Sequence, residues 1–172
     1  MVQKARQPCK MVPVSGQTTG GMRIMSQPTA TVAIVETNQD IAEMLRLLLT
    51  QEGYRVVTVP LADLVQGQGE PGALLATHDP DVIIWDIGYP YADHWARFQR
   101  LWLHRSARGR GFILTTTNPD LFAAIHETAP GVVLFSKPYD LDQLLEAVRR
   151  LTVEARARRQ AGCSPGQDPH RG

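Results

Sequence analysis

The sequence predicts an α/β fold in which helices cover both faces of a five-stranded parallel sheet. Five short apolar runs are nearly continuous in hydrophobicity, as in strands that are buried on both faces. Segments with helical spacing of apolar residues separate them, and strand followed by helix five times over favours parallel pairing. The runs are 31–35, 55–59, 82–85, 112–115 and 132–135.

Each run is followed by a segment that is expected to be helical. Apolar residues recur at helical spacing in the first, third and fifth segments, and Asn118-Pro119 is a favourable start for the fourth. The second is weak. The segments are one after residue 37, then about 71–77, about 94–103, one from Asn118, and one from 141 to about 160. This succession suits the flavodoxin-like doubly wound order 2-1-3-4-5, whose sites lie at the carboxyl ends of the strands.

The folded domain is expected over residues 30–155, between two tails. Residues 1–29 mix polar residues, glycine and proline without a period, so we expect a disordered N-terminal tail. Residues 156–172 are the end of the last helix and a disordered C-terminal tail. Residues 1–30 carry +4 and residues 151–172 carry +2, which leaves −5 on 31–150. An acidic middle argues against nucleic-acid binding by the folded domain.

Composition favours a cytoplasmic protein. No apolar run approaches the roughly 20 residues of a membrane helix, and no signal peptide is recognisable. Cys9 and Cys163 lie near opposite ends and match no metal spacing, as expected for free thiols in a reducing compartment. We therefore expect no membrane partner. The five histidines are scattered without a catalytic pattern, and we expect them at the surface.

Four polar side chains stand at predicted strand ends. Glu36 follows the first strand and Asp86 the third, Thr116 ends the fourth, and Lys137 follows the fifth. Such a set suits phosphoryl transfer to a carboxylate. Asp86 is the candidate nucleophile, while the Lys137 ammonium and the Thr116 hydroxyl are expected to contact phosphoryl oxygens. A Mg²⁺ held by carboxylates and carbonyls would neutralise part of the charge.

Four stretches carry a resemblance to a known family. They are IVETNQDIAEMLRLLLTQEGYRVVTV, PDVIIWDIGYP, ILTTTNPD and FSKPYDLDQLLEAVRRL, which together span about 31–152. The chain resembles the response-regulator receiver domains of two-component signalling, the CheY-like superfamily. The resemblance implies that Asp86 is the phosphoacceptor, with Thr116 and Lys137 beside it. It also implies that Glu36, Asp86 and the Gly88 carbonyl bind Mg²⁺.

The pattern departs from the family at four positions. Thr37 replaces the second acid after the first strand, so Mg²⁺ binding is expected to be weak. Leu134 occupies the position of the aromatic switch residue. His94 replaces a glycine after Asp93, and Thr117 replaces a small residue after the hydroxyl. Thr37-Asn38-Gln39-Asp40 also fits a helix-capping pattern, and capping by Thr37 is favoured over metal binding.

The leading hypothesis is a stand-alone receiver, a monomer or weak dimer. A histidine kinase or phosphotransfer protein would phosphorylate Asp86, and output would pass through protein contact. The resemblance implies that this contact lies at the face formed by the fourth helix, fifth strand and fifth helix. Its catalysis would be limited to its own phosphorylation and dephosphorylation. The alternative is a pseudo-receiver, an interaction module that works without phosphorylation. A flavodoxin-like small-molecule binder is disfavoured, because the first loop lacks a phosphate cradle and Glu36 would repel an anion.

Overall fold

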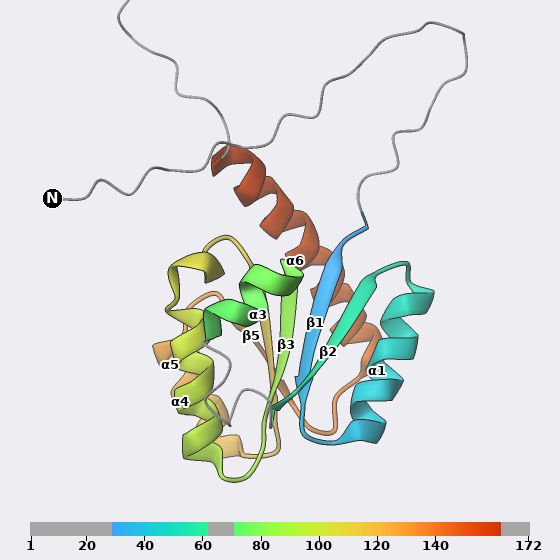
Figure 1. Ribbon diagram of the computed structural model, residues 1–172. Coiled ribbons are helices and arrows are strands. Elements are labelled where there is room, and N and C mark those ends of the chain that lie inside the picture. The colour runs from blue at the N-terminus through green and yellow to red at the C-terminus, as the bar shows by residue number, and fades with distance from the viewer. Residues whose placement is uncertain (1–28, 62–70, 163–172) are drawn as a thin grey trace, which may run out of the picture.

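A computed structural model describes residues 29–61 and 71–162, and these residues form one parallel five-stranded sheet (Figure 1). The strand order is β2-β1-β3-β4-β5, which confirms the predicted doubly wound topology. Most of the predicted tails, residues 1–28 and 163–172, lie outside the described residues. The strands are β1 (Thr31–Glu36), β2 (Arg55–Pro60), β3 (Val82–Ile87), β4 (Gly111–Thr116) and β5 (Val133–Ser136).

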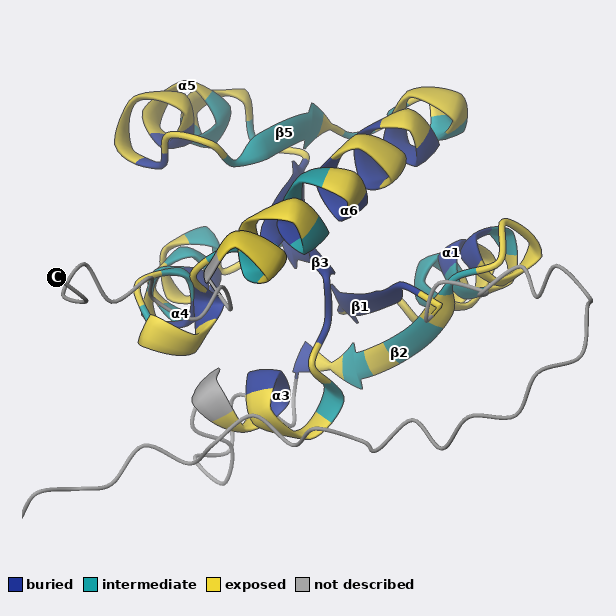
Figure 2. Cartoon of the chain, turned by 90° about the horizontal axis from the view of Figure 1, so that it is seen from above, coloured by how far each residue is buried: buried dark blue, intermediate teal, exposed yellow. Residues whose placement is uncertain are grey.

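Helices cover both faces of this sheet, and each turns a buried side toward it (Figure 2). One core lies between the sheet and α3, α4 and α5, and a second lies between the sheet and α1 and α6. The helices are α1 (Gln39–Gln51), α3 (Pro71–His78), α4 (Tyr91–Trp102), α5 (Pro119–Thr128) and α6 (Leu141–Gly162), with a short 3-10 turn at Arg105–Ala107.

The alternation of side chains along each strand decides which residues share a face. On β3, Trp85 and Ile87 pack in the core beneath α4, whereas Ile84 packs in the core beneath α1 and α6. Asp86 follows Ile84 by two residues, so its carboxylate lies on the α1–α6 face. On β4, Ile113 belongs to that same face and Leu114 to the other. Thr115 therefore shares the face of Asp86, and Thr116 does not.

The predicted cap of the first helix is wrong by one residue. Asn38, not Thr37, is the N-cap of α1, and its side-chain oxygen accepts from the N–H groups of Asp40 and Ile41. Asparagine is among the preferred N-cap residues. The backbone N–H of Thr37 instead donates to the Glu36 carboxylate at 3.0 Å. The predicted start of α5 is confirmed, because Asn118 caps it in the same way and Pro119 opens its first turn.

Two other helices differ from their predicted lengths. Helix α4 begins at Tyr91, three residues before the predicted start, so that Asp93 lies in its first turn rather than before the helix. Helix α6 runs to Gly162 and its last turns extend beyond the amino ends of the strands (Figure 1). Within the described ranges, no helix is long and apolar enough to cross a bilayer.

Candidate functional site

The candidate site lies at the carboxyl ends of the strands, at the lower edge of the sheet in Figure 1. Asp86 ends a buried strand and is 5% exposed. Its Oδ1 atom is 2.8 Å from Lys137 Nζ and accepts a hydrogen bond of 3.1 Å from Thr115 Oγ1. One side of this carboxylate is therefore paired with a cation and with a buried hydroxyl.

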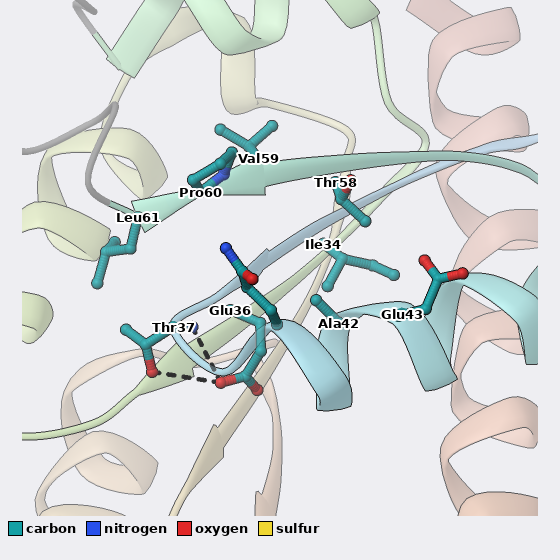
Figure 3. A pocket seen from close by; sticks show the side chains of 10 residues that line it. Ile34, Glu36, Thr37, Ala42, Glu43, Thr58, Val59, Pro60 and Leu61 are labelled. Carbon is teal, nitrogen blue, oxygen red and sulfur yellow. Dashed lines mark hydrogen bonds between the residues drawn. The ribbon is translucent and has the colours of Figure 1, made fainter.

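Glu36, at the end of the neighbouring strand β1, is equally enclosed. It is 7% exposed, and its Oε2 is 2.9 Å from Lys137 Nζ. Its Oε1 accepts from the backbone N–H groups of Thr37 and Asn38, at 3.0 and 3.1 Å. Figure 3 shows this carboxylate turned toward Thr37. A buried carboxylate needs such partners, and Glu36 has them on both oxygens.

Lys137 joins the two carboxylates. Burial of its ammonium group opposes protonation, but hydrogen bonds and charges from Asp86 and Glu36 outweigh burial and raise the pKa of Lys137. Burial also raises the pKa of the neighbouring Tyr139 hydroxyl. Of the four predicted strand-end residues, the structure thus brings Glu36, Asp86 and Lys137 together.

The fourth, Thr116, is turned away from the carboxylates. Its hydroxyl donates to the Ile87 carbonyl at 3.0 Å and accepts from the Asn118 N–H at 3.2 Å. The hydroxyl that contacts Asp86 belongs to Thr115, which the sequence reasoning missed. The strand period of two was the available signal, because Asp86 and Thr115 are directly paired across β3 and β4 and so point to the same face.

The other carboxylate oxygen of Asp86, Oδ2, lies beside Thr37 and Gly88. Thr37 Oγ1 is 3.4 Å from this atom, and an added Cβ on Gly88 would be 3.4 Å from it. In the described contacts Oδ2 has no cation, whereas Lys137 or backbone N–H groups engage the other three carboxylate oxygens. Mg²⁺ often binds through one carboxylate and several waters, so this oxygen with the Thr37 hydroxyl and Gly88 fits a weak site.

His94 is buried, contrary to the prediction that all five histidines lie at the surface. It is 7% exposed, because α4 begins early and directs it toward the loop after β3. Its Nδ1 accepts a hydrogen bond of 3.2 Å from the Gly88 N–H. Burial lowers the pKa of His94, although the Asp86 charge partly opposes this. An acceptor Nδ1 in a neutral ring places the proton on Nε2.

Two pockets flank the cluster. One, of about 400 Å³, lies between β2 and the first turns of α1, and Glu36 and Thr37 line its inner end (Figure 3). The other, of about 430 Å³, is lined mainly by apolar residues of α1 and by the segment from Lys137 to Leu141. Both pockets leave open space beside the ends of β1 and β5. Among the described residues, no three His, Cys, Asp or Glu side chains are grouped in a way that could hold a metal ion.

Known structures share this fold, and those compared below cover between 72% and 77% of the chain. Chemotaxis protein CheY4 of Vibrio cholerae is 22% identical, with a TM-score of 0.57 over 72% of this chain and 98% of that chain. The signal receiver domain of a putative Luxo repressor protein from Vibrio parahaemolyticus is 18% identical, with a TM-score of 0.60 over 77% and 97%. A response regulator receiver protein from Sinorhizobium medicae is 17% identical, with a TM-score of 0.55 over 74% and 98%.

The fold is that of a response-regulator receiver domain. No protein-family model matches the chain, and no curated protein matches it by sequence. The likeness to the receiver fold is therefore structural, at low sequence identity. Leu134 packs into the core beneath α4, while the adjacent Phe135 lies on the other face against Tyr139, with ring centroids 6.0 Å apart.

Proposed function

We propose that this chain is a signalling receiver and that Asp86 accepts a phosphoryl group. One observation carries the proposal. Among the described contacts, Asp86 Oδ2 pairs with no cation and lies beside Thr37 and Gly88, while Oδ1 of the same carboxylate is held by Lys137 and Thr115. A carboxylate fixed through one oxygen presents the other to an incoming group in a defined direction, and such orientation lowers the barrier to transfer.

The reaction is a displacement at phosphorus. Oδ2 of the ionised Asp86 donates an electron pair to phosphorus, the bond from phosphorus to the donor breaks, and the donor's leaving atom keeps that bond's electron pair. Lys137 already lies 2.8 Å from Asp86 and can move its charge onto a phosphoryl oxygen. When bound, Mg²⁺ neutralises part of the phosphoryl charge. Asp86 Oδ2, Thr37 and the Gly88 carbonyl would hold it, with Glu36 through a water.

The partners follow from this chemistry. The phosphoryl donor is a histidine kinase or a phosphotransfer protein, and catalysis by the chain is limited to adding and losing its own phosphoryl group. We infer a cytoplasmic module, a monomer or weak dimer, whose output passes through protein contact rather than through nucleic acid. The fold that the chain shares with solved receiver domains supports the signalling role.

A second candidate function has its own observation in favour. Lys137 and two backbone N–H groups occupy most of the carboxylate oxygens among the described contacts, and the neutral Thr37 stands beside the remaining one. A site already satisfied in this way can serve as a structural element. In that case the chain is a pseudo-receiver, an interaction module that is not phosphorylated.

Intact mass separates the two functions. The protein is incubated with Mg²⁺ and acetyl phosphate, beside Asp86→Asn and the control Asp142→Asn, which changes an exposed carboxylate in the first turn of α6. The proposal expects one added phosphoryl group on the wild type and on the control, and none on Asp86→Asn. An unmodified wild type at high Mg²⁺ would favour the pseudo-receiver.

A further inference from the structure

The peptide group between Ile87 and Gly88 is held at both of its polar ends. The Ile87 carbonyl accepts a hydrogen bond of 3.0 Å from Thr116 Oγ1, and the Gly88 N–H donates to His94 Nδ1 at 3.2 Å. Thr116 Oγ1 in turn accepts from the Asn118 N–H. One continuous chain of hydrogen bonds therefore connects the loop after β4, the loop after β3 and the first turn of α4.

This peptide lies directly beside the reactive oxygen. An added Cβ on Gly88 would be 3.4 Å from Asp86 Oδ2 and 3.9 Å from His94 Cε1. With standard backbone dimensions, the Gly88 nitrogen then lies within about 6 Å of Oδ2. A phosphoryl group on Oδ2 extends its oxygens into this region and requires hydrogen-bond donors there. The Gly88 N–H is a nearby donor, but it is directed at His94.

Two properties of His94 favour a persistent hydrogen bond from the Gly88 N–H to Nδ1. The side chain is buried, and its Nδ1 carries a lone pair because it accepts the hydrogen bond from the Gly88 N–H. Its position in the first turn of α4 also ties the acceptor to a helix rather than to a free loop. Turning the Gly88 N–H toward Asp86 would leave a buried acceptor without its partner, which costs free energy.

We propose that His94 is a positioning residue of the Asp86 site. Together with Thr116, it fixes the peptide between Ile87 and Gly88 with its N–H turned away from Asp86. A phosphoryl group on Asp86 therefore receives no hydrogen bond from the Gly88 N–H. Its lifetime is shorter than it would be if this N–H were free to donate to it. The shorter lifetime rests on the proposed function, whereas the fixed orientation of the peptide between Ile87 and Gly88 does not depend on it.

The variants His94→Leu and His94→Asn test the lifetime. Leucine fills a similar volume without an acceptor, and the asparagine oxygen can take the place of Nδ1. His126→Asn, at an exposed position on α5, is the matched control. After phosphorylation with acetyl phosphate and removal of the donor, we expect a lifetime at least about threefold longer for His94→Leu, because the freed N–H forms a charge-assisted bond. His94→Asn and the control should resemble the wild type.

A second measurement needs no phosphorylation. In uniformly ¹⁵N-labelled protein, a scalar coupling across the hydrogen bond should connect the Gly88 and His94 Nδ1 nitrogens. Its absence from the wild type would overturn the fixed peptide. Equal lifetimes for the wild type and His94→Leu, or lengthening by His94→Asn as well, would overturn the role of the acceptor. If no variant is phosphorylated, the proposed function and the lifetime consequence fail, and the coupling alone decides whether His94 fixes the peptide.

Discussion

An aspartate is buried at each end of the sheet, but the cations that pair with it differ between the two ends. At the amino end, Asp81 has a 4% exposed side chain, accepts from the Thr31 N–H at 2.9 Å, and is paired with Arg159 and, at 3.6 Å, with Arg156. The nearby Asp79 pairs with Arg110 and Arg159. At the carboxyl end, Asp86 and Glu36 share Lys137.

The balance of charge distinguishes these two clusters. Among the described contacts, the cluster at the amino end has more cations than carboxylates, whereas the cluster at the carboxyl end has two carboxylates on one ammonium. A buried charge without full compensation reduces stability, and such arrangements concentrate at functional sites. The comparison therefore supports a structural role for Asp81, which anchors α6, and agrees with the chemical role that we propose for Asp86.

The largest effect is expected from removing the shared ammonium. Lys137→Met leaves two buried carboxylates facing each other without a cation, and breaking a buried pair in this way costs about 3 kcal/mol. Urea unfolding should show a lower midpoint with an unchanged slope. Adding Asp86→Asn to Lys137→Met should restore much of the loss. If the double variant is no more stable than Lys137→Met, the two carboxylates do not repel each other.

The next largest effect is expected when aspartate is replaced by asparagine at each end of the sheet. Asp81→Asn should lower the free energy of unfolding by about 2 kcal/mol, because Arg159 and Arg156 lose the carboxylate that holds them. Asp86→Asn should change it by less than about 1 kcal/mol in either direction, since Lys137 keeps Glu36. Chemical denaturation of both variants measures the difference. A larger loss from Asp86→Asn than from Asp81→Asn would reverse the assignment of roles.

A smaller effect is expected on metal affinity. Thr37→Asp adds a carboxylate beside Asp86 Oδ2 and should tighten Mg²⁺ binding about tenfold, because Mg²⁺ prefers charged oxygen ligands. Thr37→Asn is the neutral control of the same shape. Titration calorimetry, or the fluorescence of the buried Trp85 next to Asp86, provides the affinity. Equal affinities for the Asp and Asn variants would place the cation elsewhere.

The smallest effect distinguishes the two adjacent threonines. Thr115→Val removes the hydroxyl that donates to Asp86 Oδ1 and should slow phosphorylation by acetyl phosphate about threefold, as expected for one lost hydrogen bond. Thr116→Val leaves that contact in place and should slow phosphorylation less. Time courses of intact mass give both rates. A larger effect from Thr116→Val would support the original sequence-based assignment of the hydroxyl.

The sequence was informative where a strand ended in a charged residue. Glu36, Asp86 and Lys137 follow apolar runs, and parallel strands bring their carboxyl ends together, so that composition and order were enough to group them. To choose between Thr115 and Thr116, the exact register of the strand is needed as well. A run of three threonines does not show which one shares the face of Asp86, and a shift of one residue reverses the face.

The remaining errors concern local geometry at helix starts. Thr37 and Asn38 both suit an N-cap, and the choice between them depends on the Glu36 carboxylate, which takes the Thr37 N–H. His94 was expected at the surface because the five histidines are scattered without a catalytic pattern. With α4 beginning at Tyr91, the same side chain turns inward to Gly88. Neither result follows from periodicity, because both depend on contacts between separate segments.

The most direct test of the contrast between the two ends is to locate the phosphoryl group. Wild-type protein treated with Mg²⁺ and acetyl phosphate is reduced with borohydride, which converts an aspartyl phosphate to homoserine, and is then mapped by peptide mass spectrometry. The account predicts homoserine at position 86 and intact aspartate at positions 79 and 81. Homoserine at position 79 or 81, or an intact Asp86 in protein that has gained a phosphoryl group, would contradict it.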